Sequence, residues 1–168
     1  MSTFCLKCAG RLKMLKQDGF RHPVCQTCGF IFYQNSKPTS SAIILNKKNE
    51  VLLIKRAIHP HFGQWDIPGG FLQNGEDPIV GLKREIKEEL KIGIGNTNLL
   101  IVCVDKYGLK TDDFYTLNLF FTCRAKKGEI VLNSENSKFQ WFAKDDIPWR
   151  ELAFDNTTIA LKALFKVK

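Results

Sequence analysis

The sequence predicts an α/β protein, because segments with strand character alternate with two segments of helical periodicity. Residues 78–90 and 155–165 carry apolar side chains at helical spacing, and Asp155 is the expected capping residue of the second helix. The segments with strand character are β-rich, mostly apolar and bounded by polar turns: residues 39–45, 51–54, 99–104, 115–123 and 139–142. The polar turn 46–49 joins the first two of them, which predicts a hairpin.

Length and charge restrict the class of protein. A chain of 168 residues suits one medium domain plus a small module, and 44% hydrophobic residues are enough for a core. No run of about 18 apolar residues and no apolar leader is present, so we expect a cytoplasmic protein without a membrane contact. The net charge of +8 favours anionic partners, although an ordinary lysine-rich surface explains most of the lysines.

The first helix has clear start signals and an unusual charge pattern. Asp77 is suited to cap the free amides, and Pro78 fits the first helical position. Ile79, Leu82, Ile86 and Leu90 form its expected apolar face, whereas three carboxylates share a neighbouring face: Glu85, Glu88 and Glu89.

Three neighbouring carboxylates repel each other, by roughly 0.2–0.5 kcal/mol per pair on a helix. One interpretation is a solvated helix on which Arg84 and Lys87 offset the repulsion. The other is a Mg²⁺ or Mn²⁺ site, because these cations prefer oxygen ligands. The Gly69–Gly70 pair and Glu76, which precede the helix, favour the metal site.

The spacing of these residues resembles the Nudix box of the Nudix hydrolases. Five residues separate Gly70 from Glu76, seven more precede Arg84-Glu85-Ile86, and Glu88-Glu89 follow after one residue. Lys91 stands where the family usually has Gly. A residue other than Gly at this position is expected to destabilise the end of the helix by up to about 1 kcal/mol. The resemblance implies an α/β/α sandwich with a mixed sheet over residues 37–168.

The resemblance also implies roles for individual residues. Glu85, Glu88 and Glu89, with the carbonyl of Gly70, are the expected Mg²⁺ or Mn²⁺ ligands, and Glu85 is either a ligand or the general base. Arg84 is expected to orient Glu85. Glu76 is expected to brace the loop, with a favourable contact to the helix dipole as the alternative.

Other candidates lie outside the box. Many Nudix proteins add an acid from a later loop, for which Glu135 is the first candidate here, followed by Asp112 and Asp113. The candidate substrate-binding residues are Arg56, His61 and Trp65, which lie at the end of a strand and in the loop after it. An ordinary surface position is the alternative for His61, and packing under the box loop is the alternative for Trp65.

Two Cys-x2-Cys pairs, sixteen residues apart, predict a structural zinc site formed by Cys5, Cys8, Cys25 and Cys28. Two disulfides or a redox pair are the alternatives, and an intracellular context disfavours disulfides. Four thiolates leave no open position for a catalytic water. Residues 1–36 resemble the zinc ribbon that precedes the Nudix domain in NADH-pyrophosphatase-like proteins, and residues 30–33 are an expected strand.

The combined resemblance implies metal-dependent hydrolysis of a nucleoside diphosphate derivative. NADH pyrophosphatases carry a Ser-Gln-Pro-Trp-Pro-Phe-Pro type run after the box, which residues 96–101 lack, so we rank ADP-ribose-like substrates first. Other nucleotide sugars, dinucleotides and oxidised nucleoside triphosphates stay open. The alternative is a nucleic-acid-binding or nucleotide-sensing protein that uses the basic ribbon. A third option is that the ribbon serves only as a homodimerisation element or as a lid.

Overall fold

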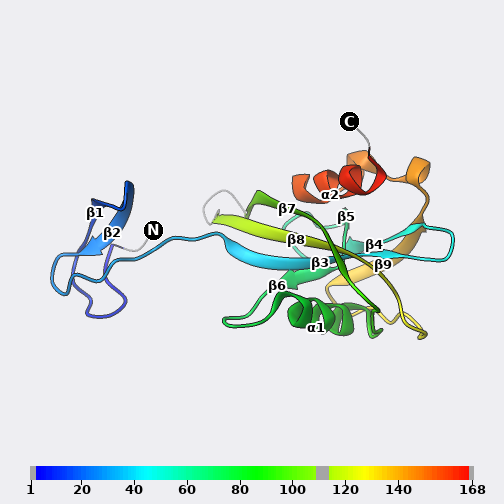
Figure 1. The fold of residues 1–168 in the computed structure, drawn as a ribbon, viewed down its shortest axis with the longest axis horizontal. Helices are drawn as coiled ribbons and strands as arrows, with labels where there is room; N and C mark the ends of the chain where they lie inside the picture. The colour runs from blue at the N-terminus through cyan, green and yellow to red at the C-terminus, as the bar shows by residue number, and fades with distance from the viewer. Residues whose placement is uncertain (1–2, 109–113, 167–168) are drawn as a thin grey trace. The chain divides into compact units, whose positions relative to one another are not determined.

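The computed structural model describes residues 3–108 and 114–166 (Figure 1). Contacts divide the chain into two compact units, Met1–Asn35 and Ser36–Lys168. Among the described residues, no helix is long and apolar enough to cross a membrane.

The N-terminal unit is built on an antiparallel hairpin of β1 (Leu12–Gln17) and β2 (Phe20–Cys25). Asp18 and Gly19 form its turn with φ of 49° and 88°, the left-handed conformation that two-residue hairpin turns need. The strand expected at residues 30–33 does not form, and only Ile31 bridges to Val24. Pro23 explains this difference, because it accepts from the Phe32 amide but has no amide of its own to extend the ladder.

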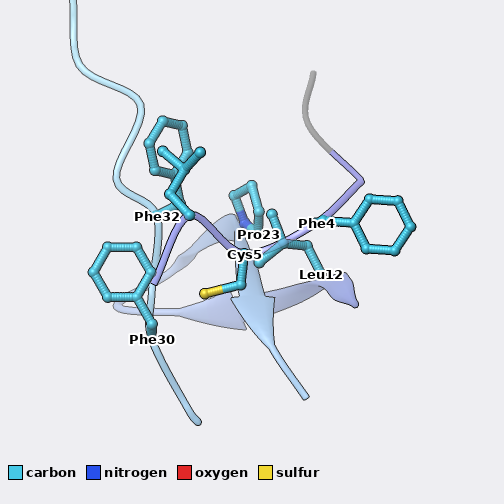
Figure 2. A pocket seen from close by; sticks show the side chains of 7 residues that line it. Phe4, Cys5, Leu12, Pro23, Phe30 and Phe32 are labelled. Atoms are coloured by element: carbon cyan, nitrogen blue, oxygen red, sulfur yellow. The ribbon is translucent and has the colours of Figure 1, made fainter. Parts of the chain in front are cut away.

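The N-terminal unit has little apolar core of its own. Its buried apolar residues, among those described, are Cys5, Pro23, Val24 and Cys25. Figure 2 shows Cys5 surrounded by the apolar side chains that line a depression of about 20 Å³. A module of this size needs an additional source of folding energy, such as a disulfide or a metal.

The second unit contains a mixed sheet with a helix on each face (Figure 1). Its path is β5-β4-β3-β8-β7, with β6 added to β3 and β9 added to β4. The β3–β8 pair is parallel and the other pairs are antiparallel. The strands are β3 (Lys37–Leu45), β4 (Val51–Arg56), β5 (Trp65–Asp66), β6 (Gly69–Phe71), β7 (Asn98–Tyr107), β8 (Phe114–Arg124) and β9 (Asn136–Phe142). The helices are α1 (Pro78–Leu90) and α2 (Asp155–Phe165), and two 3₁₀ turns, Lys144–Asp146 and Trp149–Glu151, precede α2. The predicted α/β/α sandwich is therefore confirmed.

Each helix covers its own apolar cluster. On α1, Leu82, Ile86 and Leu90 are fully buried in one cluster, whereas Ile79, which was expected beside them, is 37% exposed. On α2, Ala160 and Leu161 are fully buried in the other cluster. The two clusters hold the helices against opposite faces of the sheet (Figure 1).

The expected hairpin of residues 39–54 forms only at its closed end. β3 and β4 pair at Leu45 and Val51 and then diverge. The segment 65–71 enters the opening, where β5 pairs with β4 and β6 pairs with β3. This opening places Gly69 and Gly70 inside the sheet, next to α1.

The ends of the helices follow from local chemistry. The Asp77 carboxylate accepts hydrogen bonds from the Ile79 and Val80 amides at 2.8 and 3.2 Å, which confirms its capping role. Helix α1 ends at Lys91, which adopts the left-handed conformation with φ of 58°. The prediction for α2 was wrong in one detail: Phe154 is the N-cap without a side-chain bond, and Asp155 is the first helical residue.

Lys91→Gly should raise the free energy of unfolding of the second unit by about 1 kcal/mol, because Gly adopts the left-handed conformation without a Cβ penalty. Lys83→Gly, on the exposed side of the same helix, should lower it by about the same amount. Urea unfolding followed by tryptophan fluorescence checks both, since Trp65, Trp141 and Trp149 lie in this unit. A loss of stability in both variants would contradict the interpretation of the helix end.

Candidate active site

Arg84 is the centre of the candidate site. It binds Glu76 through two hydrogen bonds, from Nε to Oε1 and from Nη2 to Oε2, both 2.8 Å long. Its Nη1 donates to Glu85 Oε1 at 2.7 Å and to Glu88 Oε2 at 3.3 Å. Nη2 also donates to the Phe71 carbonyl at 3.2 Å. One guanidinium therefore ties the loop before α1 to two carboxylates on the helix.

The contacts of Glu76 favour the bracing role over the helix-dipole alternative. Besides Arg84, its carboxylate accepts from the Gln73 amide at 2.9 Å, whereas Asp77 caps the helix. The hydrogen bonds from Arg84 hold the pKa of Glu76 at about 2, well below its ordinary value. Glu76 is therefore charged across the physiological pH range and holds the loop through Arg84.

The glycine pair allows the loop to approach the carboxylates closely. A Cβ on Gly70 would lie 2.5 Å from the carboxyl carbon of Glu85. A Cβ on Gly69 would lie 2.3 Å from the Ser40 carbonyl oxygen, and Gly69 has a φ of 149°. Any other residue at either position would displace the backbone of the opening or Glu85 itself.

Glu89 is the most deeply buried carboxylate of the box, at 8% exposure. Its Oε2 accepts from the Gly69 amide at 2.9 Å, and its Oε1 accepts from Asn136 Nδ2 at 3.3 Å. Burial raises the pKa of Glu89 to about 8, and the nearby charges of Asp66 and Glu85 act in the same direction. Burial also raises the pKa of Glu85, against the opposing effect of Arg84.

A cavity of about 260 Å³ opens over Gly70, Glu85 and Glu89. Arg56, the candidate substrate-binding residue, and Glu135, the candidate additional acid, also line this cavity, and their roles stay predictions. Aromatic and polar side chains complete much of the remaining wall: Thr39, Phe71, Tyr107, Thr116, Asn118, Phe154 and Asn156.

Glu88 does not line this cavity. Its side chain is 56% exposed and its contact in the site is the hydrogen bond from Arg84. Its assignment as a metal ligand stays a prediction. Asp112 and Asp113 lie outside the described residues.

Arg56 is held by three groups. Its Nε donates to the Pro60 carbonyl at 2.9 Å, its Nη1 lies 3.3 Å from Asp66 Oδ2, and its guanidinium carbon lies 5.1 Å from the ring centre of Phe154. Asp66 also accepts from Thr157 Oγ1 at 2.6 Å, and burial raises the pKa of its carboxyl. Arg56 therefore presents a fixed positive charge to the cavity.

The other two candidate substrate-binding residues lie elsewhere. Trp65 is 5% exposed and packs edge-on against Phe142, with ring centres 5.0 Å apart, in the cluster under α2. This burial, away from the cavity lining, favours the packing alternative for Trp65, and its contact with the substrate stays a prediction. His61 is exposed and hydrogen-bonded to Gln64 at 2.8 Å. It does not line the cavity itself, but its ring packs edge-on against Phe154, which does, with ring centres 4.7 Å apart.

Several residues at this cavity were not predicted from the sequence. Asn136 binds Glu89, while Tyr107 and Phe154 form part of the wall. They come from β9, the end of β7 and the segment before α2, which are far apart in sequence. No local spacing relates them to the box, so no signal in the sequence indicated them.

The donor set at the cavity fits a divalent cation. Glu85, Glu89 and the Gly70 carbonyl offer hard oxygen atoms, which Mg²⁺ and Mn²⁺ prefer. Burial raises the pKa values of Glu85 and Glu89, and a cation bound between them would favour their charged forms.

The cysteines of the N-terminal unit fit zinc. All four sulfur atoms lie within 4.8 Å of one another, with Cys5–Cys28 at 3.8 Å and Cys8–Cys25 at 3.5 Å. Four sulfurs about 2.3 Å from a tetrahedral zinc are separated by about 3.8 Å, whereas a disulfide needs about 2.05 Å. The Thr27 and Cys28 amides donate hydrogen bonds to the Cys25 sulfur at 3.4 and 3.5 Å. The hydrogen bond from the Cys28 amide is the main reason that the pKa of this thiol is lowered. The geometry therefore favours zinc over two disulfides.

The fold and the site define a Nudix-type α/β/α protein with a carboxylate-rich cavity. The sequence profile of the NUDIX domain matches residues 35–162, and the chain belongs to the NUDIX family.

Relatives and solved structures agree with this assignment. The chain is 31% identical over 118 residues to the ADP-ribose pyrophosphatase of Methanocaldococcus jannaschii, covering 69% of this chain and 66% of the relative. It is 30% identical over 151 residues to the NAD-capped RNA hydrolase NudC of Pseudomonas aeruginosa, covering 88% of this chain but only 50% of the relative. The crystal structure of a NUDIX hydrolase from Nitrosomonas europaea matches with a TM-score of 0.73 and 27% identity, covering 97% of this chain and 88% of that chain.

Cys25→Ser should release zinc and unfold the N-terminal unit, because that unit lacks a sufficient apolar core. Zinc content measured by elemental analysis of the purified protein checks this. Cys103→Ser is the matched control, since Cys103 is a half-buried free thiol outside the cluster. Unchanged zinc content in Cys25→Ser would contradict the four-thiolate site.

Glu89 should make the stability of the protein depend on pH when no Mg²⁺ or Mn²⁺ is added. Its pKa is about 8 when folded and 4.5 ordinarily, so the folded state binds a proton that the unfolded state has lost. The free energy of unfolding should therefore fall by roughly 2–4 kcal/mol as pH rises from about 5 to 8. Glu89→Gln should remove this part of the pH dependence in urea unfolding measurements. The same slope in both proteins would show that Glu89 has an ordinary pKa.

Proposed function

We propose that the protein hydrolyses a nucleoside diphosphate derivative at its pyrophosphate linkage in a metal-dependent reaction, with an ADP-ribose-like substrate preferred. One observation carries this proposal: Glu85, Glu89 and Gly70 meet in a cavity that also presents a fixed arginine and aromatic rings. Carboxylates alone would repel an anionic substrate, and rings alone would not cleave it. Their combination suits a nucleotide whose phosphates reach the carboxylates through a cation.

The metal site is proposed from the same residues. Gly70, Glu85, Glu88 and Glu89 would hold Mg²⁺ or Mn²⁺, with the first, second and fourth of these residues at the cavity. The bound cation would neutralise phosphate charge and lower the pKa of a bound water.

Glu85 is the proposed proton acceptor. Its carboxylate lies against Gly70, and burial raises its pKa, so it takes a proton more readily than an ordinary glutamate. The hydrogen bond from Arg84 fixes one of its oxygens and leaves the other available. Glu135, which is exposed at the cavity, is the second candidate for this role.

Two further groups position the reactants in this proposal. The Gly69 amide and Asn136 hold Glu89 so that it does not rotate away from the cavity. Arg56, fixed by Asp66 and Pro60, offers a positive charge for a substrate phosphate. Because the Arg56 guanidinium is already held in position, binding a phosphate to it costs less conformational entropy.

The ranking of substrates draws on the relatives. One relative is named as an ADP-ribose pyrophosphatase and the other as a NAD-capped RNA hydrolase. ADP-ribose and NAD share a nucleoside diphosphate, which is the part that the proposed chemistry requires. The absence of the Pro-rich run after the box places ADP-ribose ahead of NADH.

The second candidate function is nucleic-acid binding or nucleotide sensing. It is favoured by the basic N-terminal segment, where residues 1–37 have six basic residues and one acidic residue, and by the relative named for an RNA substrate. Four thiolates on a zinc ion would remove two of these positive charges, which weakens this alternative.

A turnover screen with Mg²⁺ or Mn²⁺ tests the proposal on ADP-ribose, NADH, diadenosine polyphosphates and 8-oxo-dGTP. Glu88→Gln should lower kcat by about 100-fold or more, because a ligand of the proposed metal site is lost. The melting temperature should stay unchanged, because replacing an exposed carboxylate costs little stability. Glu129→Gln, at an exposed position outside the site, is the matched control.

Near-normal turnover by Glu88→Gln would remove Glu88 from the metal site and leave Glu85 and Glu89 as its acidic ligands. If the protein binds nucleotides but cleaves none of the substrates, the enzymatic proposal is contradicted and the nucleotide-sensing alternative is favoured.

A further inference from the structure

We propose that Ser40 is a positioning residue for Glu85: its buried hydroxyl donates a hydrogen bond to the second carboxylate oxygen, Oε2, when Glu85 holds a divalent cation. This inference rests on the proposed function, because it concerns a carboxylate of the same site. Ser40 lies on β3, outside the Nudix box, so it adds to the site a residue that the spacing of the box does not contain.

The hydroxyl of Ser40 has no hydrogen-bond partner. Ser40 is fully buried, and within residues 3–108 and 114–166 its Oγ is the only buried side-chain oxygen or nitrogen atom that is left without one. Nearly all buried polar groups in proteins are paired, because an unpaired one is destabilising. Ala42, on the same strand, shows that a side chain without a hydroxyl fills such a place in the core. The hydroxyl of Ser40 therefore points to a hydrogen bond that forms in another state of the site.

The side chain of Ser40 faces α1. Ser40 pairs with Leu119 in the parallel ladder and lies two residues before Ala42, and both of these residues belong to the apolar packing under α1. Residues two apart on a strand point to the same face of a sheet, and so do directly paired residues on neighbouring strands. Helix α1 packs on β3 and β6 at this face (Figure 1). The hydroxyl thus lies between the sheet and the helix that carries the carboxylates.

Gly70 keeps the way from Ser40 to Glu85 open. Ser40 and Gly70 are direct partners in the antiparallel pair of β3 and β6, and Cβ positions of such partners lie about 4.5–5.5 Å apart on one face. A Cβ on Gly70 would lie 2.6 Å from Glu85 Oε2. Because Gly70 has no side chain, it does not separate the hydroxyl from the carboxylate.

Glu85 has an oxygen that can accept this hydrogen bond. Its Oε1 accepts from Arg84 Nη1 at 2.7 Å, whereas no group in the described part of the chain donates to its Oε2. In this structure the Ser40 hydroxyl does not bond to Oε2, so the proposed bond requires a rotation of the Glu85 side chain. Hydrogen bonds from Arg84 to one oxygen and from Ser40 to the other would fix the plane of the carboxylate.

The other carboxylates of α1 are less suitable partners for Ser40. Glu89 Oε2 already accepts from the Gly69 amide, and its Oε1 accepts from Asn136. Glu88 has a side chain that is 56% exposed. Glu85 therefore combines a place beside the partner strand of Ser40 with an unoccupied oxygen.

Ser40→Ala tests the inference by calorimetric titration of Mn²⁺ into the whole chain without a substrate. The variant removes one buried oxygen atom and should weaken Mn²⁺ binding by roughly 10- to 100-fold, as is typical when a group that orients a metal ligand is lost. Its melting temperature without a cation should stay the same or rise, because the hydroxyl has no partner in that state.

Two further variants separate positioning from packing. Ala42→Ser places a second unpartnered hydroxyl on the same strand and face, and it should lower the melting temperature while leaving Mn²⁺ binding unchanged. Ser40→Ala in a Glu85→Gln background should weaken Mn²⁺ binding by less than about 2-fold further, because the effect of the hydroxyl passes through Glu85.

Three outcomes would overturn the inference. The first is an unchanged Mn²⁺ affinity in Ser40→Ala. The second is a melting temperature that falls by several degrees in Ser40→Ala without a cation, since the hydroxyl would then already stabilise the fold. The third is an equal loss of Mn²⁺ affinity with and without the Glu85 carboxylate, since Ser40 would then act through another group.

The inference and the proposed function fail in distinguishable ways. If the protein cleaves none of the substrates but binds Mn²⁺ in a Ser40-dependent manner, the enzymatic proposal is refuted and the role of Ser40 stands. If the protein cleaves ADP-ribose and Ser40→Ala binds Mn²⁺ as the wild type does, only the role of Ser40 is refuted.

Discussion

The hydrogen bonds of Arg84 are the interaction on which the candidate site depends. Glu85 and Glu88 repel each other on α1, at roughly 0.2–0.5 kcal/mol for such a pair, whereas a hydrogen bond to a charged group contributes about 1.5–3 kcal/mol. Arg84 makes one such bond to Glu85 and two to Glu76, whereas its 3.3 Å contact with the exposed Glu88 carboxylate contributes little. Its attraction therefore outweighs the repulsion, and Arg84 holds the loop with Gly70 against the helix.

The divergence of β3 and β4 gives these carboxylates access to the cavity. If β3 and β4 had paired along their whole length, the sheet would have no opening beside α1. Because β5 and β6 fill the opening instead, the Gly69 amide reaches Glu89 and Gly70 reaches Glu85. The absence of side chains at both glycines is what allows this approach, so the backbone of the opening and the acids of the helix form one unit.

Residues with a local spacing were predicted well, and residues brought together by the sheet were not. The helix start at Asp77, the contact of Arg84 with Glu85 and the convergence of four cysteines all follow from spacing within one segment. Trp65 was placed at the substrate, but its large ring is buried under α2. The sequence does not reveal which face of a two-residue strand will be covered.

The sequence by itself determined the family, the carboxylate-bearing helix and the cysteine site, because each depends on residues at fixed separations along the chain. Only the tertiary structure decided the walls of the cavity. Asn136, Tyr107 and Phe154 come from separate elements, and they reach the site because β9 pairs with β4 and because α2 and β7 pack together. These residues become neighbours through contacts between segments that are distant in sequence, and such contacts cannot be inferred from a local sequence pattern.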